Sequence, residues 1–317
     1  ITTMIKVENL SKFYGDVKAV KSINFELNNG EIVGFLGANG AGKSTTLKVM
    51  TGYLTPTAGN VYVNDLDIQS NILEIQKQIG YLPELNPLYS EMRVYDLLEF
   101  TGNIRNITGK AFKNSLARVV EQCGLKGVVH RMISERSKGY KQRIGLACAM
   151  IHDPKILILD EPVTGLDPNQ IVEIRELIKG LGQKKLVLIS SHILQEIQAT
   201  VSRIIIIHKG EIVADGTSDE LITGAEGNTK MTLELMNAGE ESIKEMKAVI
   251  PSVNFGRISK ENGITMVHLE YPTKSDPRKD IFAYAISKDW VILEMTPAKT
   301  NLEDIFRDLT TEGDINA

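Results

Sequence analysis

A glycine-rich stretch, GANGAGKST at residues 37–45, constrains the fold more than any other part of the chain. It follows the apolar run EIVGFL and precedes the helical run TLKVMTG, so it lies between a predicted strand and a predicted helix. Its glycines let the backbone curl until successive N–H groups point at one anion. The pattern predicts a phosphate-binding loop, in which Lys43 reaches the β- and γ-phosphates of a nucleotide and the Ser44 hydroxyl binds Mg²⁺. The alternative is a glycine-rich turn with a chance lysine, which the flanking strand and helix make rare.

Two carboxylates follow a second apolar run, ILILDEP at residues 156–162. Asp160, at the end of the predicted strand, can orient a hydrated Mg²⁺, and Glu161 can polarise an attacking water as a general base. Two acids after a strand usually begin a solvated loop. The phosphate-binding loop upstream favours the catalytic interpretation.

Two more side chains stand at predicted strand ends. His192 follows LVLISS and can hold a γ-phosphate or the attacking water, although a lone histidine at a strand end is more often structural. We favour function because Ser190, Ser191 and His192 would emerge at the same sheet edge as Glu161. Tyr14, upstream of the loop, can stack on a purine or simply pack, and both interpretations stay open from the residues alone.

Composition narrows the class of protein. The 317 residues carry a net charge of -4 and a pI near 5.9, which argues against nucleic acid as the main partner. Residues 229–317 hold 11 basic and 15 acidic side chains, whereas residues 1–228 hold 25 of each. The two cysteines have no metal-ligand spacing and are expected to be buried thiols in a reducing compartment. No window approaches the roughly 18 to 20 apolar residues of a membrane span, so a second subunit would have to cross any membrane.

The order of apolar runs predicts an α/β domain interrupted by helices. Strands are expected at residues 5–14, 19–28, 31–37, 59–64 and 79–83. The Asn29–Gly30 pair predicts a tight hairpin between the second and third of them. Helical periodicity predicts a helical insert over about residues 85–153. Continuous apolar strands resume at 155–162, 185–190 and 203–208, which suits a mixed or parallel sheet buried on both faces.

A second, smaller domain is expected after a linker at residues 222–230. Its predicted elements are strand 231–235, helix 240–249, strands 253–259 and 264–271, helix 276–287 and strand 290–295. A last helix at 301–310 would begin with Asn301 as its N-cap. The expected α+β accessory domain covers residues 229–317 and contains no recognisable chemistry.

With the phosphate-binding loop, ILILDEP, GLDP and SSH in this order, the chain resembles the ATP-binding subunit of ABC transporters. The resemblance covers about residues 4–221, and its motif set is highly specific. It implies a P-loop NTPase fold, in which a RecA-like core carries an antiparallel β subdomain and a helical insert, over a domain of residues 1–225. It also implies ATP and Mg²⁺ as cofactors, and ATP hydrolysis coupled to transport.

The resemblance gives a role to SKGYK at residues 137–141, the place of the family signature sequence. In the family, two ATP-binding domains face each other head to tail, and the signature of one covers the ATP held by the other. Ser137 and the Gly139 backbone would then bind the γ-phosphate of a partner's nucleotide, with Lys138 adding positive charge. The usual form is Leu-Ser-Gly-Gly-Gln, whereas this chain has Arg136 to Tyr140 and keeps only the serine and the second glycine.

The remaining roles are carried over position by position. Tyr14 would stack on adenine, Asp160 would position Mg²⁺, Glu161 would be the base, and His192 would be the switch. The phosphates and Mg²⁺ would be held by Gly37, Asn39, Gly40, Gly42, Lys43, Ser44 and Thr45. Asp167 would cross the dimer interface, and Glu84 would sense the γ-phosphate and couple it to the helical insert. Glu84 stands where the family usually has glutamine; a carboxylate can still reach the Mg²⁺ shell, but the effect of the exchange is open.

The signature variant and the closing NLEDIFRDLT resemble the exporter branch whose ATPase and permease are separate polypeptides, including gliding-motility ATP-binding subunits. This implies a separate integral membrane permease, a second ATPase subunit, and a place on the cytoplasmic face of the inner or plasma membrane. The permease would dock at Leu85–Tyr95, which otherwise reads as an ordinary surface loop. The alternatives are an importer ATPase with a regulatory C-terminal domain and a soluble, non-transport ABC ATPase. Nothing in the sequence identifies the cargo.

Overall fold

The computed structural model describes residues 2–225, 228–261, 263–272, 275–297 and 302–311. The chain divides into two compact units, Ile1–Ser218 and Asp219–Ala317. Each unit has its own buried apolar cluster.

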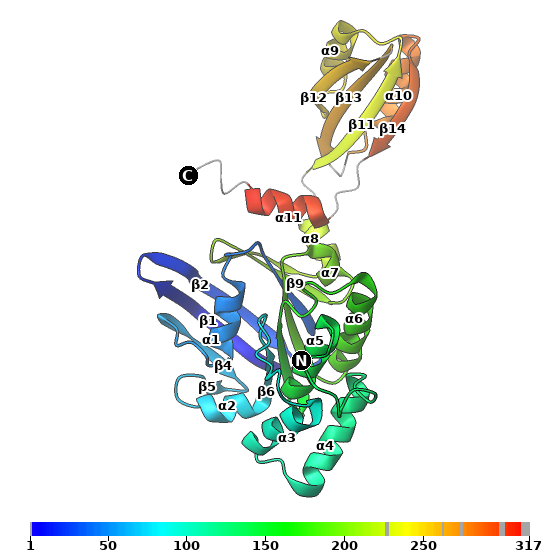
Figure 1. Cartoon of the computed structure of the whole chain (residues 1–317). Helices are drawn as coiled ribbons and strands as arrows, with labels where there is room; N and C mark the ends of the chain where they lie inside the picture. The colour runs from blue at the N-terminus through cyan, green and yellow to red at the C-terminus, as the bar shows by residue number, and fades with distance from the viewer. Residues whose placement is uncertain (1, 226–227, 262, 273–274, 298–301, 312–317) are drawn as a thin grey trace. The chain divides into compact units, whose positions relative to one another are not determined.

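A six-stranded sheet forms the centre of the first unit (Figure 1). Its strand order is β10-β9-β3-β8-β7-β6, and only the β9–β10 pair is antiparallel. Every residue of β7 and β8 is buried, which confirms the expectation of apolar strands covered on both faces. The bounds are β3 (Ile32–Leu36), β6 (Ile79–Leu82), β7 (Ile156–Asp160), β8 (Leu186–Ser191), β9 (Arg203–His208) and β10 (Glu211–Gly216).

A smaller antiparallel sheet, of order β2-β1-β4-β5, completes the strand-rich part of this unit. Helix α1 (Lys43–Met50) contacts both β2 and β7, so it lies between the two sheets. Phe25 on β2 and Phe35 on β3 join the sheets through rings whose centroids are 5.8 Å apart. The bounds are β1 (Thr3–Tyr14), β2 (Val17–Asn28), β4 (Ala58–Val63) and β5 (Leu66–Asp67).

The predicted hairpin at Asn29–Gly30 is wrong. The turn is present, with Gly30 at a φ of 77°. However, β2 pairs with β1, whereas β3 pairs with β8 and β9 in the other sheet. The Asn-Gly pair therefore turns the chain from one sheet into the next, because burial of β3 on both faces outweighs the local hairpin preference.

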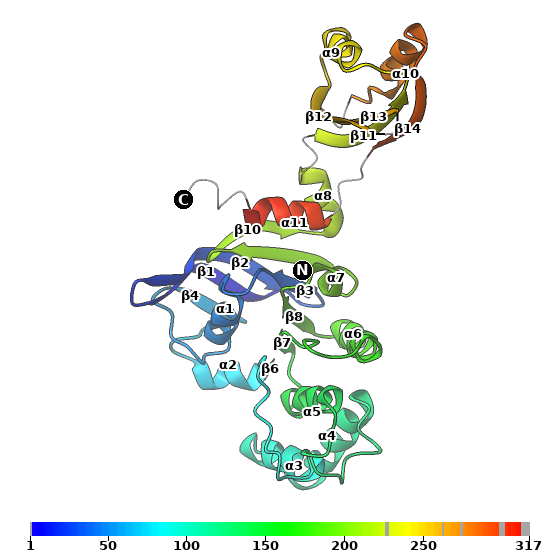
Figure 2. The same ribbon diagram turned by 45° about the horizontal axis from the view of Figure 1, so that its top comes forward.

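The helical insert lies between β6 and β7, and Figure 2 shows its helices gathered at one end of the unit. Its helices are α3 (Val94–Ile104), α4 (Gly109–Gln122) and α5 (Lys138–Met150). Helix α5 contacts β6 and therefore joins the insert to the core. Arg118 of α4 donates to the carbonyl oxygens of Met150 and Ile151 at 3.0 and 3.2 Å, at the C-terminal end of α5, where a cation is favoured. The other helices of the unit are α2 (Ile72–Gln78), α6 (Pro168–Gly182) and α7 (Leu194–Gln198).

The second unit contains a four-stranded antiparallel sheet of order β12-β13-β11-β14. Its βαββαβ sequence of elements is that of a ferredoxin-like split βαβ unit, with α9 and α10 on one face of the sheet (Figure 2). The core joins alternate residues of the strands, such as Leu233 and Val267, to Met246 and Ile281 of the helices. The bounds are β11 (Asn228–Met236), α9 (Glu240–Val249), β12 (Asn254–Glu261), β13 (Ile264–Pro272), α10 (Arg278–Ser287), β14 (Val291–Pro297) and α11 (Leu302–Thr311).

The predicted linker is largely wrong. Helix α8 (Ser218–Ala225) and the start of β11 occupy most of residues 222–230. The small and polar residues that suggested a linker are compatible with a helix whose first turn carries Asp219 and Glu220. Asn301, the predicted N-cap of the last helix, lies outside the described residues. Among the described residues, no helix is both long enough and apolar enough to cross a membrane.

His152, after helix α5, provides a test of the packing between insert and core. Its Nε2 lies 3.1 Å from the carbonyl oxygen of Ile79. Burial, followed by the Arg105 guanidinium, lowers the pKa of His152 from its ordinary 6.5 to about 4. The unfolded chain binds this proton at higher pH, so the stability contributed by neutral His152 is complete above pH 6.5 and is lost as the pH falls toward 4.

We predict that His152→Gln makes the free energy of unfolding less sensitive to acid, because glutamine can still donate to Ile79 but does not titrate. Urea unfolding of both proteins at several pH values between 6.5 and about 4 measures this. Over this pH range, the free energy of unfolding of the wild type should fall by roughly 2–3 kcal/mol more than that of the variant. A stability difference that is the same at every pH would contradict the role of His152.

Candidate functional site

The phosphate-binding loop connects β3 to α1 at the carboxyl end of the parallel strands. Gly42 is the N-cap of α1 with a φ of 109°, and a Cβ atom there would lie 2.5 Å from the carbonyl oxygen of Ala19, so only glycine fits. Gly37 is buried, whereas Ala38, Asn39 and Gly40 are exposed. The N-terminal amides of α1, which include those of Ser44 and Thr45, are available to an anion approaching from solvent.

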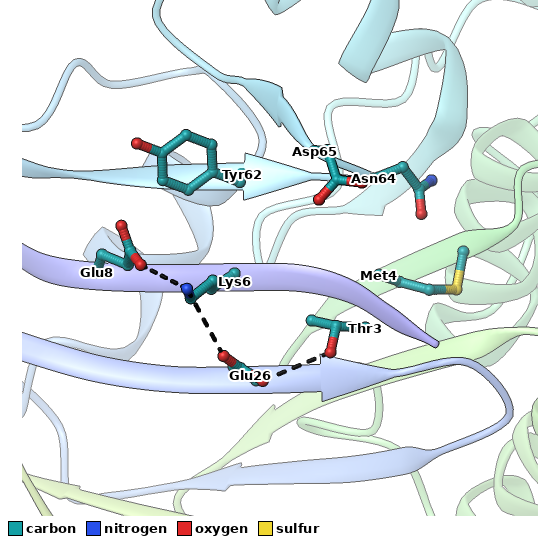
Figure 3. Close-up of a pocket in the computed structure, with 8 residues that line it drawn as sticks. All are labelled: Thr3, Met4, Lys6, Glu8, Glu26, Tyr62, Asn64 and Asp65. Carbon is teal, nitrogen blue, oxygen red and sulfur yellow. Dashed lines mark hydrogen bonds and ion pairs between the residues drawn. The ribbon is translucent and has the colours of Figure 1, made fainter. Parts of the chain in front are cut away.

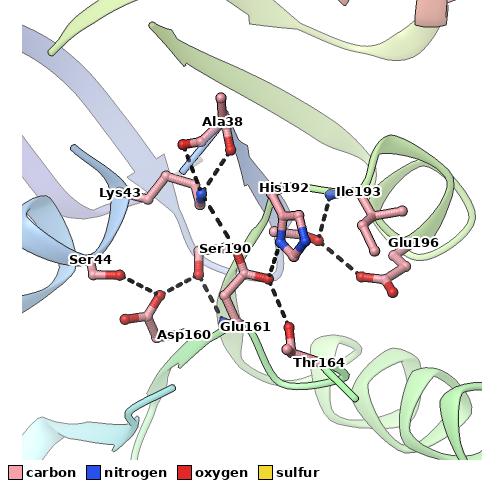
Figure 4. Close-up of polar contacts among 12 residues, drawn as sticks. Ala38, Lys43, Ser44, Asp160, Glu161, Thr164, Ser190, His192, Ile193 and Glu196 are labelled. Carbon is pink, nitrogen blue, oxygen red and sulfur yellow. Dashed lines mark hydrogen bonds and ion pairs between the residues drawn. The ribbon is translucent and has the colours of Figure 1, made fainter. Parts of the chain in front are cut away.

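Lys43 is held inside this loop. Its side chain is 6% exposed, and Nζ donates to the carbonyl oxygens of Gly37 at 2.7 Å and Ala38 at 3.2 Å. Nζ also lies 3.4 Å from Oε1 of Glu161 (Figure 4). The ammonium is therefore fixed at the centre of the loop, where it can bind phosphate oxygens.

Asp160 ends β7 and is 1% exposed. Its Oδ1 accepts hydrogen bonds from Ser44 Oγ at 3.2 Å and from Ser190 Oγ at 2.6 Å. A hydroxyl from the start of α1 and a carboxylate from the end of β7 converge here, and both are oxygen donors of the kind that Mg²⁺ prefers. Ser44 and Asp160 therefore fit the ion expected for a nucleotide site.

Glu161 follows directly, with a positive φ of 50° that is uncommon for a residue with a Cβ atom. Its amide donates to Ser190 Oγ at 2.9 Å. Its Oε2 accepts from Thr164 Oγ1 at 3.1 Å and lies 2.9 Å from His192 Nδ1 (Figure 4). The carboxylate is 5% exposed, and its orientation is fixed by side chains from the loop, from the segment after β8 and from its own turn.

His192 emerges after β8, at the sheet edge where β7 ends. The preceding Ser191 donates from Oγ to Glu196 Oε2 at 2.9 Å and accepts from the Ile193 amide at 3.0 Å. Burial, and also the nearby Glu161 carboxylate, raises the pKa of Glu196. These contacts fix the backbone on both sides of His192.

Tyr14 ends β1 and lies on the hairpin that leads into β2. The carbonyl oxygen of Ala19, near the start of β2, touches Gly42, so this hairpin borders the phosphate-binding loop. Tyr14 is 47% exposed, and Lys12 Nζ lies 5.5 Å from its ring centroid. The ring is thus accessible for stacking on a flat ligand.

Glu84 stands apart from the other acids. It is exposed two residues after β6, whose Leu82 pairs with Leu159 of β7. Burial raises the pKa of Tyr81, and the carboxylates of Asp160 and Glu84 raise it further. Among the described hydrogen bonds none joins Glu84 to Ser44 or Asp160, so the structure brings it near the site without a direct contact.

Ser137, Gly139 and Asp167 form a second group. Ser137 is the N-cap of α5 and accepts from the Tyr140 amide at 3.4 Å. Asp167 is the N-cap of α6 and accepts from the Gln170 amide at 2.9 Å. Ser137 and Asp167 are exposed, and in the described part of the chain neither they nor Gly139 bonds to the phosphate-binding loop.

The sequence placed Ser190 at this sheet edge without giving it a role, and it gave no role to Thr164. Ser190 bridges the Asp160 carboxylate and the Glu161 amide, and Thr164 donates to Glu161. A serine in the otherwise apolar run LVLIS was the available signal for Ser190, because buried polar groups usually have partners. No sequence signal distinguished Thr164.

A separate hollow of about 470 Å³ lies on the antiparallel sheet (Figure 3). Its lining comes from β1, β2 and β4 and the turn that follows β4, and includes Lys6, Glu8 and Glu26. None of the predicted site residues lines it, so we do not assign the nucleotide to this hollow.

Comparison with known proteins identifies the family. A family model described as ABC transporter matches residues 20–164. The linearmycin resistance ATP-binding protein LnrL of Bacillus subtilis is 31% identical over 310 residues, which are 97% of this chain and 98% of LnrL. The chain belongs to the ABC transporter ATP-binding proteins. Its first unit is an ABC-type ATPase cassette with the P-loop NTPase fold.

Other ABC relatives differ in length. The probable multidrug ABC transporter ATP-binding protein YbhF of Escherichia coli is 36% identical over 220 residues, which are 69% of this chain but only 38% of YbhF. A solved structure described as an ATP binding subunit of an ABC transporter superposes with a TM-score of 0.64 at 28% identity. The superposed region covers 70% of this chain and 92% of the chain in that structure. The cassette is therefore the common part, and LnrL also matches the second unit.

Proposed function

We propose that this chain is the ATP-hydrolysing subunit of an ABC exporter and drives a separate membrane permease as a head-to-tail pair with a second ATPase subunit. The observation that carries the proposal is the separation of two complementary groups within one cassette. Lys43, Asp160 and Glu161 gather at one sheet edge, whereas Ser137 and Asp167 are exposed at the starts of α5 and α6.

The first group would bind ATP and activate water. Lys43 and the amides at the start of α1 would hold the phosphates, and Ser44 and Asp160 would hold Mg²⁺, which neutralises phosphate charge when bound. Tyr14 would stack on the adenine. Glu161 would take a proton as water attacks the γ-phosphorus and the bond to the β-phosphate oxygen breaks, while His192 and Thr164 keep its carboxylate oriented.

The second group would cover a partner's nucleotide. The start of α5 offers the positive end of its helix dipole and the hydroxyl of exposed Ser137, which suit the γ-phosphate of ATP bound by the other subunit, although Gly139 itself is buried. ATP would thus bring two subunits together, and loss of the γ-phosphate would let them separate. Asp167, at the start of α6, would meet the same interface.

The permease would dock on a groove of about 430 Å³ between the core and the helical insert. Its wall is largely apolar and aromatic, and it includes Tyr53, Pro87, Tyr89 and Phe100. Tyr89 is 58% exposed and Phe100 43% exposed, with ring centroids 6.0 Å apart. These features suit a short amphipathic helix of a membrane subunit, which would place this chain at the cytoplasmic membrane face.

Export is the favoured direction because LnrL, which matches both units, is named for resistance. Removal of a toxic compound from the cell is the simplest transport function behind such a name. The second unit would be an accessory domain of the same subunit.

We predict that Glu161→Gln lowers ATP turnover by at least about a hundredfold, because the amide cannot accept the proton from water. ATP binding should stay within about twofold, and ATP-bound dimers should persist in size-exclusion chromatography. Glu176→Gln, at a residue 66% exposed on α6, is the control and should hydrolyse ATP normally. Turnover near that of the wild type in Glu161→Gln would remove Glu161 from its proposed role.

Purification of the tagged chain from detergent-solubilised membranes of its host tests the transport claim. A multi-span membrane protein should co-purify in stoichiometric amount. Phe100→Asp in the groove should release it, whereas Val213→Asp, at a residue 36% exposed on β10, should not. Recovery of soluble partners alone would leave the ATPase standing and overturn the assignment to a transporter.

A further inference from the structure

The first turns of α5 and α6 touch at the surface proposed to face a partner's nucleotide. The ammonium of Lys138 lies against Gly165, in the turn that leads into α6. The Gly139 backbone packs on the Gln170 side chain so closely that a Cβ atom at position 139 would lie 2.5 Å from Gln170 Cδ. The turn that carries Ser137 is therefore seated directly on the turn that carries Asp167.

A charged contact continues this junction further along both helices. Arg143 of α5 forms an ion pair with Glu173 of α6, and its Nη1 also donates to the carbonyl oxygen of Cys123 at 3.2 Å. Cys123 is the C-cap of α4, where a cation complements the helix dipole. The Arg143 side chain is 17% exposed and that of Glu173 is 59% exposed. One guanidinium thus links two helices of the insert to one helix of the core.

The opposite side of α5 is attached to the segment after β6. Asn86 Nδ2 donates to the carbonyl oxygen of Lys141 at 3.0 Å, and its side chain packs against Gly145. Asn86 is two residues beyond Glu84. Helix α5 therefore lies between the segment that follows Glu84 and helix α6, and Arg143 makes a contact on the side that faces α6.

We infer that Arg143 and Glu173 are positioning residues that hold Ser137 and Asp167 in one fixed arrangement. The two turns come from different parts of the cassette, since α5 belongs to the insert and α6 follows β7 of the core. Both must meet the same partner nucleotide at once, and a link between their helices limits misalignment. This inference rests on the head-to-tail dimer of the proposed function.

The matched variants Glu173→Arg and Glu176→Arg test the inference. Both residues lie on α6 with similar exposure, but among the described residues Glu176 pairs with Lys179 of its own helix and with no other helix. Glu173→Arg places two guanidinium groups together, so we expect kcat to fall by about threefold to tenfold, with KM for ATP unchanged. Glu176→Arg should change neither value. The double variant Arg143→Glu/Glu173→Arg should recover part of the loss, because the ion pair returns but the bond to Cys123 does not.

Two further measurements distinguish an error in the proposed dimer from an error in the positioning role. Specific ATPase activity of the wild type should rise with protein concentration; if it does not, the proposed dimer is wrong. If it does rise but Glu173→Arg behaves like Glu176→Arg, the positioning role is overturned and the dimer stands. A general loss of folding in Glu173→Arg would lower its melting temperature and its ATP affinity together, and this outcome would also contradict the inference.

Discussion

The parallel pairing of β3, β8 and β7 is the constraint on which the site depends. Parallel neighbours end at the same edge of a sheet, so the loop after β3, the acids at the end of β7 and the histidine after β8 meet although they are far apart in sequence. The contact between Ser44 and Asp160 joins residues 116 positions apart. Long-range pairing of buried strands, rather than any local motif, assembles the chemistry.

The site is locally unfavourable and is supported by its surroundings. Lys43 and Glu161 form an ion pair in which both side chains are nearly buried, and desolvation offsets much of the attraction in such pairs. Glu161 also has a left-handed backbone conformation, which costs on the order of 1 kcal/mol or more. The apolar packing of the fully buried strands β7 and β8 offsets both of these free-energy costs. Such local conflicts are typical of functional sites.

The sequence predicted the parts that depend on local pattern. The apolar runs located the buried strands, and the glycine spacing located the loop around Lys43. It failed where a partner distant in sequence decides the outcome. Asn29–Gly30 fixed a turn but not which sheet receives the next strand. The contact between the Lys138 ammonium and Gly165, which brings the starts of α5 and α6 together, could not be seen from either segment alone. The bridge made by Ser190 needs the β7–β8 register, which no single strand specifies.

The central claim is that each nucleotide is shared by two subunits, and complementation between two inactive variants tests it most directly. Lys43→Ala should not bind ATP, and Ser137→Arg should bind ATP without covering a partner's site, so each should be inactive alone. A mixed dimer contains one complete site, made from Lys43 of one subunit and Ser137 of the other, and random mixing should restore about a quarter of wild-type ATPase activity. If both variants are folded and mixed dimers form, but the mixture is no more active than the separate variants, the shared site would be contradicted.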